Sequence, residues 1–255
     1  MMIEIVVNGC NGRMGQTVVA LAQENPDLAV VAGVDPKGQA DPSWTFPTYR
    51  TLSDVEESAA VVVDFSLPEG TTELVQTASA RGMGVVIATT GLDQDQLRAL
   101  EEAATSVPIL RAANMSLGIN LLKALVKQAV QALGSTFDVE IVERHHRMKK
   151  DSPSGTALAL ADVAKEAAEG DPSYVHGRHG TDAKRSDTEI GIHAVRGGTI
   201  VGEHDVIFAG SDEVITLSHK AYSRKLFAAG ALKAAQYLAG RKPGLYGMED
   251  VIAGD

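Results

Sequence analysis

The first 35 residues constrain the fold more than any other stretch of the chain. Residues 3–7 read as a short buried strand, glycines follow at positions 9, 12 and 15, and a helical pattern covers residues 16–24. Glycines let the backbone turn tightly and approach a pyrophosphate, whose charge then lies at the helix N-terminus. The spacing is GxxGxxG rather than GxGxxG, so a plain strand-to-helix turn is an alternative interpretation.

A second strand, residues 28–34, ends at Asp35. In dinucleotide-binding units an acid at this point binds ribose hydroxyls, and about 20 residues separate it from the glycine loop. Asp35 follows Gly15 at that interval, which predicts a nicotinamide dinucleotide site. Asp35 could instead be only a turn residue before Pro36. Because Lys37 follows and no arginine comes directly after Asp35, both NADH and NADPH stay possible.

Three further apolar runs, residues 61–65, 84–88 and 108–110, alternate with helical patterns. Such alternation predicts a parallel, doubly wound sheet. Residues 88–91 and 112–116 follow the C-terminal ends of their strands, where open α/β sheets bind ligands. Both loops are candidate nicotinamide contacts, although their Thr, Asn and Ser residues would also suit helix caps.

The stretch VERHHRMKKDSPSGTA, residues 142–157, is where we expect the chemistry. His145 and His146 stand among four cations in a chain of formal net charge −10, and such a cluster favours a small polyanion as ligand. Imidazole can transfer a proton near neutral pH, and an ammonium can bind an anion. A strand would point the two histidines to opposite faces, so the backbone must leave the strand here for both to reach one ligand. The cations are Arg144, Arg147, Lys149 and Lys150.

Pro153 and Ser154 stand at the entry of a helical pattern that follows this stretch. The first turn of a helix has unpaired amides and the positive end of the helix dipole, which bind carboxylates or phosphates. A solvated charged loop before an ordinary capped helix is the alternative interpretation.

The remaining patterns predict a second, smaller set of elements. Apolar residues at 117, 121, 125 and 129 form a helical stripe that Gly134 ends, and residues 138–143 alternate like a strand. Residues 190–195 and 199–202 flank two glycines, a hairpin signal, and antiparallel strands follow at 206–208 and 214–218. The closing helix, residues 224–238, is expected to pack on the first domain. We expect oligomerisation, since few helices cover the second sheet.

Composition excludes several classes of protein. The chain has 33 acidic against 23 basic residues, which argues against a general nucleic-acid binder. Cys10 is the only cysteine, so no intrachain disulfide or cysteine zinc cluster can form. The spacing of His176 and His179 suits a metal, but no acidic or cysteine ligand is patterned around it, so we predict no metal site. Without a signal or membrane-spanning pattern, we expect a soluble cytoplasmic protein.

Taken together, these residues resemble the 4-hydroxy-tetrahydrodipicolinate reductase family, the dihydrodipicolinate reductases of diaminopimelate and lysine synthesis, over essentially the whole chain. Two positions depart from the family pattern, because Ala88 stands where glycine is common and Lys150 is an extra cation. The matching motifs are GCNGRMG at 9–15, ATTG at 88–91, AANMS at 112–116, ERHHRMKKDSPSGTA at 143–157, EIGIHAVRGGTIVGEH at 189–204 and HKAYSR at 219–224.

The resemblance implies a Rossmann-like doubly wound parallel sheet in residues 1–116 and 226–255, which binds NADH or NADPH. It also implies a second α+β domain on a mixed or antiparallel sheet, residues 117–225, which binds substrate and forms a homotetramer. The implied cofactor-binding residues are Gly9, Cys10, Asn11, Gly12, Arg13, Met14, Asp35, Ala88, Thr89, Thr90, Ala112, Ala113, Asn114 and Met115. The implied substrate-binding residues are His146, Lys149, Ser154, Gly155 and Thr156. The resemblance also implies that His145 is a catalytic proton donor or acceptor and that Lys149 is the second proton donor.

By the same resemblance the substrate is a small cyclic dicarboxylate, whose two charges suit Lys149 and the amides of residues 155–156. It loses water, accepts a hydride from NAD(P)H, and receives a proton with the help of His145. Two alternatives stay open. Another Rossmann-type reductase of a small anionic carbonyl or imine needs no pair of carboxylate-binding groups, and a non-catalytic dinucleotide sensor does not need the HisHisxxLys pattern of residues 145–149.

Overall fold

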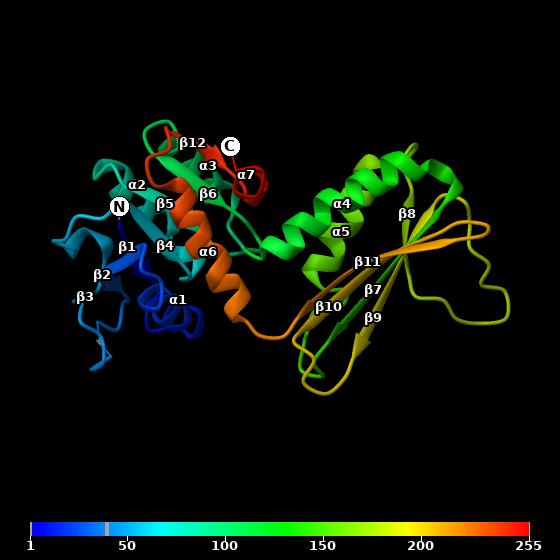
Figure 1. The fold of residues 1–255 in the computed structure, drawn as a ribbon, viewed down its shortest axis with the longest axis horizontal. Helices are drawn as coiled ribbons and strands as arrows, with labels where there is room; N and C mark the ends of the chain where they lie inside the picture. The colour runs from blue at the N-terminus through cyan, green and yellow to red at the C-terminus, as the bar shows by residue number, and fades with distance from the viewer. Residues whose placement is uncertain (1, 39–40, 255) are drawn as a thin grey trace. The chain divides into compact units, whose positions relative to one another are not determined.

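The computed structural model describes residues 2–38 and 41–254 of the chain. The chain divides into two compact units, each built on its own β-sheet (Figure 1). Unit 1 is Met1–Leu117 with Lys225–Asp255, and unit 2 is Gly118–Arg224. The C-terminal segment therefore returns to the unit that the N-terminal segment begins.

Unit 1 contains a seven-stranded sheet in which every strand pair is parallel. The strand order is β12-β6-β5-β4-β1-β2-β3, so the chain winds outward from β1 in both directions. This confirms the predicted parallel, doubly wound sheet. The strands are β1 (Ile3–Asn8), β2 (Leu28–Val34), β3 (Thr48–Tyr49), β4 (Val61–Asp64), β5 (Gly84–Ile87), β6 (Pro108–Arg111) and β12 (Gly244–Tyr246).

Helices cover both faces of this sheet and enclose two apolar cores. Val7 and Val63 face the core formed with α1 and α6, whereas Val6 and Val62 face the core formed with α2 and α3, because successive strand residues point to opposite faces. Runs of consecutive valines are therefore buried on both sides. The helices of unit 1 are α1 (Arg13–Gln23), α2 (Thr71–Ala80), α3 (Gln94–Ala103), α6 (Lys225–Leu238) and α7 (Met248–Ala253), with short 3-10 helices η1 (Leu52–Asp54) and η2 (Pro68–Gly70).

The closing helix α6 lies against the strands of unit 1 (Figure 1), as the sequence predicts. Its buried face is made mainly of alanines with Leu238, and these small side chains let the helix approach the sheet closely. Strand β12 follows α6 and extends the sheet by pairing with β6. The sequence did not predict this strand, because the short segment GLY between Pro243 and a helix carries no strand pattern of its own.

Unit 2 contains a five-stranded mixed sheet, as predicted, with the order β11-β10-β7-β9-β8. Strand β10 is antiparallel to β7 and β11, whereas β7, β9 and β8 run parallel. Both α-helices of this unit share one core with one face of the sheet. The elements are α4 (Leu117–Leu133), η3 (Gly134–Thr136), β7 (Asp138–His145), α5 (Gly155–Ala167), β8 (Ser173–His176), β9 (Glu189–Arg196), β10 (Gly202–Ala209) and β11 (Val214–Ala221).

The hairpin predicted around Gly197 and Gly198 is wrong. Strands β9 and β10 do not pair with each other, because β7 lies between them and pairs with both. The two glycines instead close a turn against the end of β7, where the Gly197 amide donates to the His145 carbonyl (2.9 Å) and the Gly198 carbonyl accepts from the Arg147 amide (3.2 Å). A local turn signal carries no information about a strand inserted from elsewhere in the chain.

Helix α4 has the length that the sequence predicts, but the stripe at 117, 121, 125 and 129 is not its core face. The buried residues are Ile119, Leu122, Val126 and Val130, whereas Leu117, Leu121 and Leu125 are 38%, 47% and 39% exposed. Apolar residues occupy more than one face of this helix, so periodicity alone does not select the buried one. No helix in the described part of the chain combines the length and apolar character needed to cross a bilayer.

Leu238 tests whether α6 belongs to the core of unit 1, since its side chain is fully buried. We expect Leu238→Ala to lower the free energy of unfolding of this unit by about 2–5 kcal/mol, because the truncation loses apolar contacts and leaves a cavity. Trp44, the only tryptophan, packs against the same core, so urea unfolding followed by its fluorescence measures the change. Leu245→Ala, at a 55% exposed leucine, is the control, and an equal loss in both variants would contradict the prediction.

Candidate functional site

The loop between β1 and α1 lies unusually close to the helix that follows it. Gly9 has a φ of +76°, and a Cβ on Gly15 would lie 2.1 Å from the Gly9 carbonyl oxygen, so both positions require glycine. The amides of Gly9 and Cys10 donate to the Val34 carbonyl (2.8 and 3.2 Å), and the Gly12 amide donates to the Gly9 carbonyl (3.0 Å). These three donors hold the loop itself, so they are not the ones that would bind a phosphate.

The first turn of α1 offers the amides that suit an anion. The helix begins at Arg13 after the N-cap Gly12, has no intrahelical partner for its first amides, and contains no acidic side chain in that turn. Met14 is half-buried against the core and Asn11 is half-buried in the loop. The thiol of Cys10 is fully buried, and burial raises its pKa to about 11, so any contact of Cys10 with a dinucleotide would involve its backbone.

A cavity of about 680 Å³ lies beside this loop, and its walls include Gly9, Gly12 and Asp35. Asp35 is buried, and its Oδ1 accepts from the Lys37 amide (3.1 Å). Asp35 is therefore both a turn residue and a wall of the cavity. Lys37 and Arg50 line the same cavity. Sequence reasoning missed Arg50, which lines this cavity together with Asp35 because β3 pairs with the end of β2.

Asp64, at the end of β4, joins the loops around this cavity. Its carboxyl group is fully buried and accepts from Asn8 Nδ2 (2.7 Å), Thr89 Oγ1 (2.7 Å) and the Ser66 amide (3.1 Å). Three strand ends, those of β1, β4 and β5, are thereby held together. Sequence reasoning missed this role, although an acid at the end of a buried apolar run was the available signal.

The two loops predicted to contact nicotinamide follow β5 and β6, which are neighbours in the sheet. Parallel strands end at the same edge, so these loops lie on the side of the sheet where the β1 loop also lies. Thr89 is buried and Thr90 is exposed, while the Met115 side chain is part of the core. Asn114 Oδ1 accepts from the Ser116 amide (2.9 Å), which fixes the turn before α4. Ala88 and Ala112 are half-buried, and Ala113 is exposed.

In unit 2, β7 ends at His145, and a turn begins at His146, whose carbonyl accepts from the Lys149 amide (3.1 Å). The backbone thus leaves the strand between the two histidines, as expected. The cluster of four cations is not preserved in space. Arg144 points to the opposite face of the sheet and pairs there with Asp205 (2.5 Å), because neighbouring strand residues alternate. Arg147 and Lys150 are exposed.

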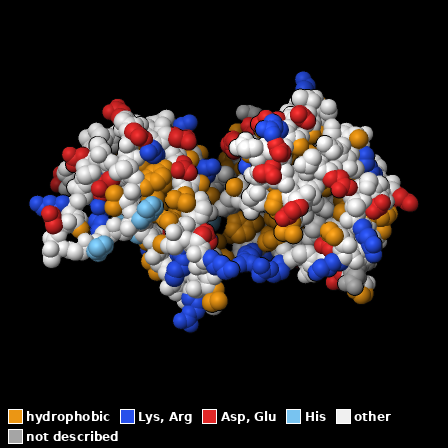
Figure 2. Space-filling model, turned by 180° about the vertical axis from the view of Figure 1, so that it is seen from behind, with side chains coloured by type: hydrophobic (Ala, Val, Ile, Leu, Met, Phe, Trp, Pro, Cys, Tyr) orange, Lys and Arg blue, Asp and Glu red, His pale blue; other side chains and the backbone are white. Residues whose placement is uncertain are grey.

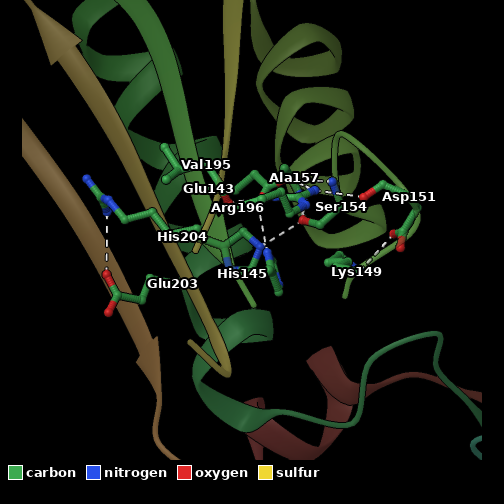
Figure 3. Close-up of polar contacts among 11 residues, drawn as sticks. Glu143, His145, Lys149, Asp151, Ser154, Ala157, Val195, Arg196, Glu203 and His204 are labelled. Carbon is green, nitrogen blue, oxygen red and sulfur yellow. Dashed lines mark hydrogen bonds and ion pairs between the residues drawn. The ribbon is translucent and has the colours of Figure 1, made fainter. Parts of the chain in front are cut away.

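His145 lies in a group of buried polar side chains (Figure 3). Its Nδ1 is 2.7 Å from Glu143 Oε2. Its ring also makes an edge-to-face contact with the ring of His204, with 5.2 Å between the ring centroids. Burial and the nearby charge of His145 lower the pKa of His204 to about 4, so His204 is neutral at neutral pH. Ser154 Oγ lies 2.9 Å from His204 Nε2. Glu143 and His204 were missed, although Glu143 precedes His145 by two residues and so shares its face.

Lys149 and the start of α5 form a second part of this group. Ser154 is the N-cap of α5, and its Oγ accepts from the Ala157 amide (3.1 Å), so Gly155 and Thr156 form the first turn. Lys149 Nζ lies 2.8 Å from Asp151 Oδ2. This hydrogen bond, with a smaller contribution from the Gly155 amide, holds the pKa of Asp151 below its ordinary value. Lys149 and the Gly155 amide, which the sequence predicts to bind a substrate carboxylate, therefore stabilise the carboxylate of Asp151 in this structure.

The described residues contain no group of three or more His, Cys, Asp or Glu side chains suited to a metal ion. On the face shown in Figure 2, acidic side chains stand among the basic ones over both units, in keeping with the net charge of −10.

Comparison with known proteins covers both units. Residues 3–115 match the family model for the dihydrodipicolinate reductase N-terminus, and residues 118–252 match the model for its C-terminus. The chain is 56% identical to the 4-hydroxy-tetrahydrodipicolinate reductase of Caldanaerobacter subterraneus over 99% of both chains. It is 46% identical to the enzyme of the same name from Clostridium botulinum over 98% of both chains.

Solved structures agree with these matches. The dipicolinate-bound dihydrodipicolinate reductase from Paenisporosarcina sp. TG-14 superposes with a TM-score of 0.81 at 26% identity, covering 98% of this chain and 99% of that one. A probable dehydrogenase from Thermotoga maritima, at 12% identity over 98% of this chain and 93% of its own, shares the fold with a TM-score of 0.64. With both family models matched and close relatives aligned end to end, the chain belongs to the dihydrodipicolinate reductase family.

Proposed function

We propose that this protein reduces 4-hydroxy-tetrahydrodipicolinate to tetrahydrodipicolinate with NADH or NADPH, in diaminopimelate and L-lysine synthesis. The observation that carries the proposal is the 56% identity, over 99% of both chains, to a 4-hydroxy-tetrahydrodipicolinate reductase. The dipicolinate bound to the related structure is a planar ring with two carboxylates, which supports a small cyclic dicarboxylate as the substrate.

Unit 1, for which we propose the span 1–116 with 226–255, binds the dinucleotide. The first turn of α1 receives the pyrophosphate, Asp35 accepts from ribose hydroxyls, and the loops after β5 and β6 surround the nicotinamide. The fit rests on the close approach at Gly15 and the cavity beside it. The nicotinamide supplies the hydride when it is bound, and the protein supplies position and field.

Unit 2, proposed as residues 117–225, binds the substrate. Lys149 exchanges the carboxylate of Asp151 for one carboxylate of the substrate, and the first turn of α5 with His146 receives the other. Charge-assisted hydrogen bonds of roughly 1.5–3 kcal/mol each orient the ring. His145 transfers a proton through Nε2, the ring nitrogen that Glu143 does not contact. Lys149 is the second proton donor.

We further propose that the protein is a homotetramer in the cytoplasm. Both α-helices of residues 118–224, all of which the structure describes, pack on one face of the mixed sheet. The other face carries Val195, which pairs with Arg144 in the sheet, and Val214, and these two valines are 44% and 63% exposed. A half-covered sheet with exposed valines suits burial against copies of the same surface.

The direct test is oxidation of NADH and of NADPH in the presence of the product of aspartate semialdehyde and pyruvate condensation. Turnover with inhibition by pyridine-2,6-dicarboxylate supports the proposal. Turnover of other carbonyl substrates without such inhibition would favour a different Rossmann-type reductase. Binding of NADH without turnover of any cyclic imine would favour a dinucleotide sensor.

We predict that both cofactors are used, with values of kcat/KM within about tenfold, or about 1.4 kcal/mol. Asp35 favours a free ribose hydroxyl, whereas Lys37 and Arg50 in the same cavity favour a 2′-phosphate. Initial rates with each cofactor at saturating substrate measure the ratio. A preference above about a thousandfold would contradict this balance of charges.

We predict that His145→Gln lowers kcat by roughly 10² or more while changing KM much less, because a general acid acts mainly in the transition state. Steady-state kinetics measure both constants, and titration with pyridine-2,6-dicarboxylate shows whether the site is intact. An unchanged kcat would remove His145 from the mechanism.

Lys149 has two proposed roles, and two substitutions separate them. Lys149→Arg keeps the cation, but a guanidinium does not give up its proton near neutral pH, whereas Lys149→Met removes the charge as well. If Lys149 donates a proton, both variants lose kcat by comparable factors. Only the Met variant should bind pyridine-2,6-dicarboxylate more weakly, by about 1.5–3 kcal/mol. Near-normal kcat in the Arg variant would leave Lys149 as a carboxylate-binding residue only.

A further inference from the structure

Three separate segments of unit 2 contribute hydrogen-bond donors to the carboxylate of Glu143. Its side chain is completely buried. Arg196 binds it with both terminal nitrogens, Nη1 to Oε2 (2.7 Å) and Nη2 to Oε1 (2.8 Å). The Ser154 amide donates to Oε1 (2.9 Å), and His145 Nδ1 lies 2.7 Å from Oε2. Figure 3 shows these side chains converging from β7, β9 and the start of α5.

These contacts fix the protonation of both partners. Burial alone would raise the pKa of Glu143, but the hydrogen bonds from Arg196, His145 and Ser154 outweigh burial and hold it below its ordinary value. An ionised carboxylate only accepts hydrogen bonds, so His145 Nδ1 must carry the hydrogen. The nitrogen left to exchange a proton is Nε2. A Cβ on Gly202 would lie 3.0 Å from Nε2, so glycine at 202 leaves this atom room.

Arg196 also connects the two residues to which we assign proton transfer. Its Nη2 donates to the Asp151 carbonyl (2.7 Å), and Asp151 Oδ2 pairs with Lys149 Nζ. The guanidinium thus holds two groups in place. One is the carboxylate of Glu143, which contacts His145, and the other is the backbone of the loop that carries Lys149. A single displaced side chain at 196 would disturb both.

We propose that Glu143 is a positioning residue for this reaction, which holds His145 in the tautomer that bears hydrogen on Nδ1 and stabilises the imidazolium before it gives up its Nε2 proton. The inference rests on the proposed function, in which His145 transfers that proton. Glu143 itself exchanges none, because the Nε2–H bond breaks while Nδ1 keeps its hydrogen and donates it in a hydrogen bond to the carboxylate. The simpler interpretation is an ion pair that only fastens β9 and α5 to β7.

Glu143→Gln separates the two interpretations, since the amide has nearly the same shape but replaces one acceptor oxygen by an NH2 group that can only donate. We expect kcat to fall on the order of 10²-fold, with the affinities for NADH and pyridine-2,6-dicarboxylate within about threefold of the wild type. In a His145→Gln background the same substitution should cost less than about threefold in kcat, because its effect passes through His145. Losses that multiply in the double variant would make Glu143 merely structural.

Glu140→Gln is the matched control. Glu140 lies on the same strand and also contacts a histidine and two arginines, His193 at 2.7 Å, Arg178 at 2.7 Å and Arg185 at 3.1 Å, but on the opposite face of the sheet. Glu140→Gln removes a carboxylate that, like that of Glu143, contacts histidine and arginine side chains. We expect this variant to keep kcat within about threefold of the wild type. A loss as large as that of Glu143→Gln would overturn the assignment.

A readout without turnover keeps the inference independent of the proposed activity. Protein labelled with [15N]histidine reports which ring nitrogen carries hydrogen, and the signals absent from His145→Gln belong to His145. At a pH where this ring is neutral, the wild type should show hydrogen on Nδ1, and Glu143→Gln should lose this single tautomer. The same tautomer in both proteins would overturn the inference. Failure of the wild type to reduce any cyclic imine would instead sink the proposed function, with the tautomer still deciding the role of Glu143.

Discussion

A buried carboxylate at the end of a strand is the constraint around which each candidate site is arranged. Removing such a group from water costs several kcal/mol unless enough donors surround it. Asp64 collects donors from the ends of three strands in unit 1, and Glu143 collects them from β7, β9 and the entry of α5 in unit 2. Each acid therefore requires separate segments to meet at one point, and the proposed ligand-binding loops begin there.

The two sites follow from two different sheets. In unit 1 all strands are parallel, so every loop that could contact a dinucleotide emerges at one edge, and the helix that starts there offers its amides. In unit 2 the mixed sheet places β7 between β9 and β10, which brings Arg196 and His204 to either side of Glu143. The antiparallel hairpin that local sequence favours at Gly197 would have separated these side chains.

The proton transfer and carboxylate binding that we propose depend on groups that are paired in the structure without a ligand. Lys149 is held by Asp151, and His145 by Glu143, so a substrate meets side chains whose orientation is already fixed. The proposed exchange at Lys149 replaces one carboxylate by another, which keeps the cation paired at each stage. Neutral His204 adds no competing charge beside His145, since burial keeps it unprotonated at neutral pH.

The sequence by itself determined the doubly wound sheet, the bounds of most strands in unit 1, the turn after His145 and the family, because these depend on apolar periodicity, glycine spacing and contiguous motifs. Only the tertiary structure decided the rest. Arg144 pairs with Asp205 on the opposite face of the sheet from His145, and β10 pairs with β7 rather than with β9. Helix α4 buries Ile119 and Leu122 rather than Leu121. Arg50, Asp64, Glu143 and Arg196 gained their places through strand pairing between segments far apart in the chain, and no local pattern encodes which strands become neighbours.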